Sequence, residues 1–123
     1  MTTSILVDDE PALLTLLLDL LEAEGYITRA VADARGLYRA LRDLRPDLFL
    51  LDIMLPGASG IELAEELHAR GYRTTPMFAM SASRRMARLA ADSGLFREVL
   101  VKPFDVFDFL ASVERQLRAV AAS

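Results

Sequence analysis

The chain has no cysteine, no tryptophan and only one histidine. Without cysteine it cannot form disulfides or a metal or redox site built on thiolates, and this composition fits a reducing compartment. No apolar run approaches the roughly 20 residues of a membrane-spanning helix. The N-terminal segment turns acidic before the apolar core of a signal peptide could form. The sequence therefore predicts a cytoplasmic protein that has no membrane partner.

Basic residues are also in short supply, with 14 Lys and Arg against 18 Asp and Glu and a net charge of -4. Nucleic-acid binding needs a basic surplus, so no nucleic acid is expected as a partner. Every basic residue except Lys102 is an arginine. An ammonium on a flexible stem differs chemically from a guanidinium, which makes Lys102 a candidate functional residue. A lysine that is merely solvated is the alternative.

Short apolar runs alternate with longer segments of helical periodicity along the 123 residues. The runs predict strands at 4–7, 27–31, 48–51, 76–80 and 98–101, and the periodic segments predict helices at 10–24, 33–44, 61–70, 83–93 and 105–121. Such alternation is typical of an α/β fold in which helices cover both faces of a five-stranded parallel sheet. We expect one domain over residues 1–123, with the continuous apolar strands 4–7, 48–51 and 98–101 in the sheet interior.

Polar residues follow four of the predicted strands. Asp8 and Asp9 follow the first strand, Asp52 the third, Ser81 the fourth and Lys102 the fifth. The carboxyl ends of parallel strands share one edge, where ligands bind in such folds. Converging carboxylates repel one another unless a cation joins them. Because the expected ligands are all oxygens, the cation should be hard: Mg²⁺, with Mn²⁺ or Ca²⁺ as alternatives.

This set of groups suits phosphoryl transfer to an aspartate. Asp52 would attack phosphorus, while the metal and Lys102 neutralise the phosphoryl oxygens. Ser81 and backbone N–H groups would hold these oxygens.

The segments "LVDDEP", "LLDIMLPGASG", "MSA" and "VKPF" occur in this order after the first, third, fourth and fifth predicted strands. Together they resemble the receiver domain of two-component response regulators, over essentially the whole chain. The resemblance implies a flavodoxin-like (βα)5 fold with strand order 2-1-3-4-5. It also implies a signalling switch that accepts a phosphoryl group on Asp52 from a histidine kinase or a histidine phosphotransfer protein, and that catalyses its own phosphorylation and dephosphorylation.

The same resemblance implies a set of metal ligands. Mg²⁺ would be bound by Asp8, Asp9, Asp52 and the backbone carbonyl of Met54. The peptide bond before Pro103 would be cis, which is a structural feature of the family.

Ser81 would be the switch hydroxyl that moves toward the phosphoryl group, and Lys102 would contact that group. Receivers commonly carry Tyr or Phe three residues before the lysine, and this chain has Val99 there. Either the switch works without a ring, or Phe96 or Phe104 replaces it.

The first predicted helix carries an unusual number of leucines. A core-facing stripe needs an arc of only about 100°. The residues that fit one arc are Leu13, Leu16, Leu17 and Leu20, which leaves Leu14, Leu18 and Leu21 toward solvent. The excess predicts either a docking surface for a helical partner or a broadly buried helix.

Three other functions are also compatible with parts of the sequence. A degenerate receiver would bind a downstream protein without phosphorylation. A haloacid-dehalogenase-type phosphatase would also use an aspartyl nucleophile, but it usually has a second acid two residues later, where this chain has Met54. A flavin or nucleotide binder would have a phosphate loop rich in Ser, Thr and Gly after the first strand, where this chain is acidic.

Overall fold

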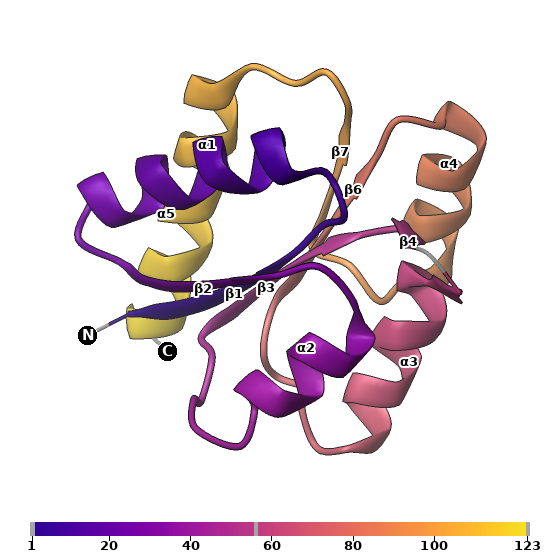
Figure 1. Ribbon diagram of the computed structural model, residues 1–123, viewed down its shortest axis with the longest axis horizontal. Helices are drawn as coiled ribbons and strands as arrows, with labels where there is room; N and C mark the ends of the chain where they lie inside the picture. Colours follow the sequence, from indigo (N-terminus) through magenta and orange to yellow (C-terminus); the bar gives the residue numbers. More distant parts are fainter. Residues whose placement is uncertain (1, 56, 123) are drawn as a thin grey trace.

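Five parallel strands form the central sheet of the computed structural model, which describes residues 2–55 and 57–122 (Figure 1). The strands are β1 (Thr3–Val7), β2 (Ile27–Val31), β3 (Leu48–Asp52), β6 (Met77–Ser81) and β7 (Glu98–Val101). Their order in the sheet is β2-β1-β3-β6-β7. Counted along the chain this is 2-1-3-4-5, so the predicted fold class and strand order are confirmed.

Helices cover both faces of the sheet (Figure 1). They are α1 (Pro11–Ala23), α2 (Ala34–Ala40), α3 (Gly60–Ala69), α4 (Arg84–Ser93) and α5 (Val106–Ala122). Side chains alternate across β1, so that Ile5 and Val7 pack in one apolar cluster with α2 and α3 while Leu6 packs in another with α1 and α5. Among the described residues, no helix has the length and apolar character to cross a membrane.

β7 lies at an edge of the sheet, so the prediction that residues 98–101 form an interior strand is wrong. The strand is nevertheless apolar because helices cover both of its faces. Leu100 packs against the cluster that contains α1 and α5, whereas Val99 packs against the cluster that contains α4. A continuous apolar run indicates that both faces of a strand are buried, and an edge strand can meet this condition as well.

Two helices differ from the sequence prediction. α2 ends at Ala40 rather than near residue 44, because the backbone tightens into turns in which Arg42 N–H donates to Arg39 O (3.2 Å) and Asp43 N–H to Ala40 O (3.1 Å). In α1, Leu17 is buried as predicted, but Leu21 is fully buried and Leu16 is 46% exposed, so the prediction for these last two residues is wrong. The buried line of α1 therefore runs through Leu17 and Leu21.

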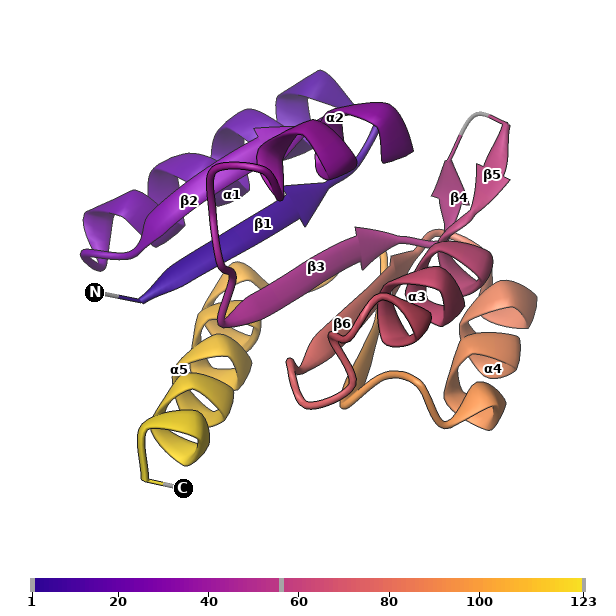
Figure 2. The same ribbon diagram turned by 90° about the horizontal axis from the view of Figure 1, so that it is seen from below.

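A two-stranded antiparallel hairpin follows β3 and was not predicted. It consists of β4 (Met54–Leu55) and β5 (Ala58–Ser59), and Figure 2 shows it beyond the carboxyl end of β3. The hairpin leads directly into α3, where the Ser59 hydroxyl accepts a hydrogen bond from Ile61 N–H (3.1 Å). It thus lies next to the edge of the sheet at which the candidate residues gather.

Candidate functional site

The candidate residues do meet at the carboxyl edge of the sheet. Asp8 follows β1 and Lys102 follows β7, as predicted, but Asp52 and Ser81 are the last residues of β3 and β6 rather than the first residues after them. Asp52 is therefore paired in the sheet with Met80. The backbones of Asp52 and Ser81 are therefore held by the hydrogen bonds of the sheet. A strand holds a reactive side chain more rigidly than a loop does.

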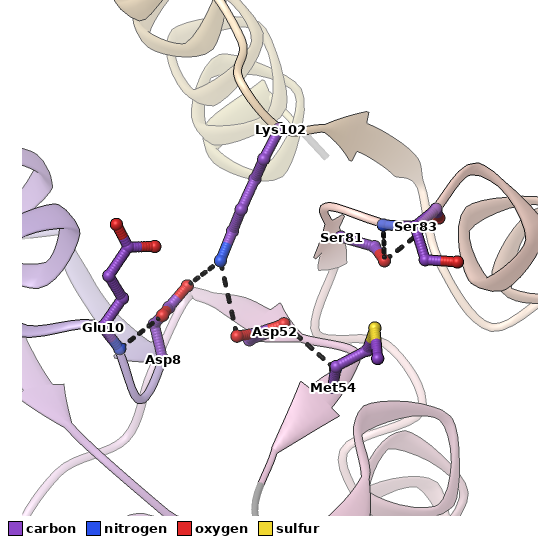
Figure 3. A network of polar contacts seen from close by, with 7 residues as sticks. All are labelled: Asp8, Glu10, Asp52, Met54, Ser81, Ser83 and Lys102. Atoms are coloured by element: carbon purple, nitrogen blue, oxygen red, sulfur yellow. Dashed lines mark hydrogen bonds and ion pairs between the residues drawn. The ribbon is translucent and has the colours of Figure 1, made fainter.

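An ammonium joins two of the carboxylates (Figure 3). Lys102 Nζ lies 2.7 Å from Asp8 Oδ2 and 3.4 Å from Asp52 Oδ2. Both aspartate side chains are almost fully buried, and the lysine side chain is mostly buried. Charged groups that are buried in this way need close partners of opposite charge. Here Lys102 is the partner of both aspartates. The single lysine of the sequence is thus part of the acidic site.

Backbone N–H groups orient the two carboxylates. Asp8 Oδ1 accepts a hydrogen bond from Glu10 N–H (2.8 Å), and Asp52 Oδ1 accepts one from Met54 N–H (3.0 Å). Each carboxylate therefore has one oxygen on the backbone and the other toward Lys102 (Figure 3). The hairpin that begins at Met54 contributes directly to the orientation of Asp52.

The pKa of Asp52 is raised above its ordinary value, mainly by burial and further by the negative charge of Asp8. The Met54 N–H bond and the charge of Lys102 act in the opposite direction. Burial by itself lowers the pKa of Lys102, but its hydrogen bonds and attraction to Asp8 and Asp52 outweigh burial and raise the pKa. Lys102 is therefore held as a cation, and ionised Asp52 is held at a cost in free energy.

Asp8, Asp9 and Asp52 each have a carboxylate oxygen within 4.8 Å of the others. Asp9 is exposed, so the cluster is open toward solvent on its side. An all-oxygen donor set of this size fits a hard divalent cation such as Mg²⁺, which keeps several water ligands. A cation here would also offset the repulsion from Asp8, which adds to the effect of burial in raising the pKa of Asp52. Met54, the proposed carbonyl ligand, begins β4 beside this cluster.

Ser81 lies at the same edge, but its hydroxyl is turned away from Asp52 and toward Ser83 (Figure 3). The hydroxyl donates to Ser83 O (3.1 Å) and accepts from Ser83 N–H (3.0 Å). The peptide bond between Lys102 and Pro103 is cis, as the resemblance implies.

The two aromatic residues near Val99 lie in different clusters. Phe96 packs with Val99 against the apolar cluster that contains α4. Phe104 stacks on Phe109 of α5, with ring centroids 5.6 Å apart, in the cluster of the opposite face. Of the two, only Phe96 shares the surroundings of Val99.

Two residues of the site were not identified from the sequence. Gly60 is buried beside β3, and a Cβ added to it would lie 2.3 Å from Asp52 O. Ser83 holds the Ser81 hydroxyl and caps α4. The signals were present, as a glycine at the start of a helix and a serine before one, but both are common enough that only the three-dimensional contacts single them out.

The sequence that forms this site matches a known protein family. Residues 5–114 match the family model described as the response regulator receiver domain. The chain belongs to this family. Receiver domains are the phosphoacceptor switches of two-component signalling, and their phosphodonors are proteins such as histidine kinases.

Curated relatives agree with this receiver assignment. The chain is 35% identical over 114 residues to the DNA-binding response regulator MtrA of Mycolicibacterium smegmatis, covering 93% of this chain and 50% of that protein. It is 33% identical over 125 residues to the transcriptional regulatory protein KdpE of Mycobacterium tuberculosis, covering 100% of this chain and 54% of that protein. The chain thus spans about half the length of these relatives.

Solved receiver structures have the same fold. A CheY-like receiver domain protein from Methanospirillum hungatei superposes with a TM-score of 0.86 at 25% identity, covering 99% of this chain and 98% of that one. The response regulator TrrA of Thermotoga maritima, solved in complex with Mg²⁺-BeF, superposes with a TM-score of 0.82 at 28% identity, covering 94% and 99%.

Proposed function

We propose that Asp52 is the phosphoacceptor of this receiver and that a histidine kinase or histidine phosphotransfer protein supplies the phosphoryl group. The observation that carries the proposal is the Lys102 ammonium between the buried carboxylates of Asp8 and Asp52, at 2.7 Å and 3.4 Å. Capping carboxylates at helix starts would need no such cation. Phosphoryl transfer needs a fixed carboxylate with positive charge beside it.

In the transfer step, an Asp52 carboxylate oxygen forms a bond to phosphorus while the P–N bond to the donor histidine breaks. The leaving imidazole takes up a proton from solvent, so the charges balance. Met54 N–H holds Asp52 Oδ1, which orients the carboxylate during the attack. Lys102 lies beside Oδ2 and would pair with an oxygen of the arriving phosphoryl group.

The residues that would hold Mg²⁺ are Asp8, Asp9, Asp52 and, through its backbone carbonyl, Met54. When bound, the metal supplies positive charge for the phosphoryl oxygens and for the acidic cluster. Ser81 would donate its hydroxyl to a phosphoryl oxygen after transfer. Loss of the group would occur when water attacks phosphorus and the bond from phosphorus to Asp52 breaks, which releases the carboxylate, inorganic phosphate and a proton to solvent. We propose that the domain catalyses this dephosphorylation itself.

Two alternative functions differ from this proposal. A phosphatase of the haloacid dehalogenase type needs a second acid beside the nucleophile, and the position two residues after Asp52 is Met54, whose side chain is 54% exposed. A degenerate receiver would bind its downstream protein without phosphorylation.

We propose that the phosphorylated domain binds a protein target, rather than a nucleic acid or a membrane.

The test is to incubate the protein with Mg²⁺ and acetyl phosphate and to follow its intact mass. We expect an adduct of one phosphoryl group that is absent from Asp52→Asn. The matched control is Asp47→Asn, because Asp47 precedes β3 at the opposite end of the sheet and should leave the adduct unchanged. Steady release of phosphate from unrelated esters would favour the phosphatase, and no adduct would favour the degenerate receiver.

A further inference from the structure

A hollow lies at the amino edge of the sheet, whereas the acidic site lies at the carboxyl edge. It is formed by the loop of residues 41–47, which joins α2 to β3, and the loop of residues 70–76, which joins α3 to β6. β3 and β6 are neighbours in the sheet, and Phe49 N–H donates to Pro76 O (3.0 Å), so the two loops are held side by side (Figure 1). The hollow encloses about 670 Å³, which is within the range of small-molecule sites in proteins.

The lining of this hollow is basic, although the chain as a whole is acidic. Arg42 and Arg45 come from the first loop and Arg70 from the second, and Asp43 is the one acidic residue among the described residues that line it. The lining thus contains three of the 14 basic residues of the chain and one of its 18 acidic residues. Two threonines of the second loop add hydroxyl groups. A hollow with this charge, here named the arginine pocket, attracts anions.

Arg70 is held in place by two neighbours. Its Nη2 lies 3.0 Å from Glu66 Oε1, and its guanidinium carbon lies 4.0 Å from the centroid of the Tyr38 ring. A guanidinium has five N–H donors, so these contacts orient its plane and still leave donors for a ligand. Arg42 and Arg45 are exposed and form no ion pair with any residue that the structure describes. The arginine pocket therefore has one oriented guanidinium and two that no carboxylate occupies.

Phosphate groups are the anions that suit these arginines best. The planar fork of one guanidinium binds two phosphate oxygens at once, and three forks on two loops exceed what a single phosphate group needs. A nucleic acid would extend beyond the pocket and meet a chain of net charge -4, whereas a small ligand contacts only the basic lining. We propose that the arginine pocket binds a small ligand that carries at least two linked phosphate groups.

A second hollow adjoins the arginine pocket and bears on the source of these phosphates. It shares Leu41, Arg42, Arg70 and Tyr72 with the arginine pocket, and Tyr38 also lines it. Two aromatic rings therefore lie next to two of the arginines. A base attached to the phosphates would have these rings to stack on, whereas a simple polyphosphate would not use them.

The test is a calorimetric titration of the unphosphorylated protein with inorganic pyrophosphate. The buffer contains EDTA, so that no metal draws the anion to the acidic site. We expect saturable binding with a dissociation constant below about 1 mM, and at least about tenfold tighter than for orthophosphate or for citrate, whose charges are all carboxylates. ADP carries the same two phosphates with a base attached. Tighter binding of ADP than of pyrophosphate would support a nucleotide as the ligand, and equal binding would support a simple polyphosphate.

Variants of the lining locate the binding. Arg42→Gln and Arg45→Gln should each weaken pyrophosphate binding about tenfold, the scale of one charged hydrogen bond. Arg85→Gln is the matched control, because it removes the same charge from an exposed position on α4 and should change the affinity by less than about twofold. Asp43→Asn should tighten binding about threefold, since it removes the negative charge of the lining. Damage to the fold cannot produce tighter binding.

The inference does not depend on the proposed function. The arginine pocket and Asp52 lie at opposite edges of the sheet, so Asp52→Asn should bind pyrophosphate as the unmodified chain does. No saturable binding below about 1 mM would overturn the inference. Equal losses in Arg42→Gln and Arg85→Gln would also overturn it, because they would show a response to overall charge rather than a site. Citrate that binds as tightly as pyrophosphate would contradict phosphate as the recognised group.

Discussion

At the scale of single residues, Asp52 is a buried acid whose ionised form is disfavoured by burial and by Asp8. Replacing it with Asn removes this charge but keeps an oxygen for Met54 N–H. We expect Asp52→Asn to raise the free energy of unfolding at neutral pH, in metal-free buffer, by on the order of 1 kcal/mol. Urea denaturation measures this change. Asp9→Asn is the control, because Asp9 is exposed and its removal should alter stability much less.

The pH dependence of this gain follows from the direction of the pKa shift. The pKa of Asp52 is raised in the folded protein from an ordinary value of 3.8. The folded protein therefore keeps this proton at pH values where the unfolded chain has lost it, and stability falls as the pH rises through that window. The advantage of Asp52→Asn should be largest above the raised pKa and should disappear below about pH 4. An advantage that persists in acid would contradict this explanation.

At the scale of elements, the passage from β3 through the hairpin to α3 depends on Gly60. Its N–H donates to Ile53 O (2.8 Å), and an added Cβ would lie 2.3 Å from Asp52 O and 2.7 Å from Ile53 Cα. Backbone atoms of a central strand cannot move aside, so Gly60→Ala should lower the free energy of unfolding by about 3 kcal/mol. It should also slow phosphorylation by acetyl phosphate, because the clash strains the backbone of Asp52 itself.

The control for Gly60→Ala is Gly25→Ala. Gly25 has φ +89°, and no atom lies within 4 Å of an added Cβ, so this variant meets backbone strain without a clash. It should cost about 1 kcal/mol and leave phosphorylation unchanged. Equal losses of stability in the two variants would show that close approach to β3 is not what constrains Gly60.

Most elements could be predicted because their signals are local. Asp33 caps α2 by accepting from Gly36 N–H (2.8 Å), and Gly94 ends α4 with φ +74°, both as such residues do in general. The edge position of β7 and the buried line of α1 could not be predicted in this way. They depend on which helices cover each strand, and this is decided by the packing of distant segments.

At the scale of the whole molecule, topology explains why the site residues could be predicted as a group. Parallel strands bring residues 8, 52 and 102 to one edge although they are far apart in sequence, and the ion pairs of Lys102 show how closely they meet. The pairing itself could not be predicted, since it depends on side-chain orientations. The same holds for the turn between Ser81 and Ser83, which two nearby serines do not reveal by sequence alone.

The acidic cluster links metal binding to the stability of the entire domain. If Asp8, Asp9 and Asp52 bind Mg²⁺ in the folded state only, Mg²⁺ should stabilise the fold by about 2.7 kcal/mol at a hundredfold excess over the dissociation constant. The melting temperature, measured calorimetrically, should rise with Mg²⁺ and return to its starting value after chelation by EDTA. NaCl at equal ionic strength controls for general screening of the charges.

Asp9→Asn provides the specific control for this effect, because it removes one exposed ligand and leaves the buried pair with Lys102 in place. We expect this variant to need a higher Mg²⁺ concentration for the same rise in melting temperature. Asp47→Asn, at the other end of the sheet, should behave like the unmodified chain. A melting temperature that does not change across millimolar Mg²⁺, or that changes equally with NaCl, would contradict a metal site in this cluster, since binding to the folded state must stabilise it.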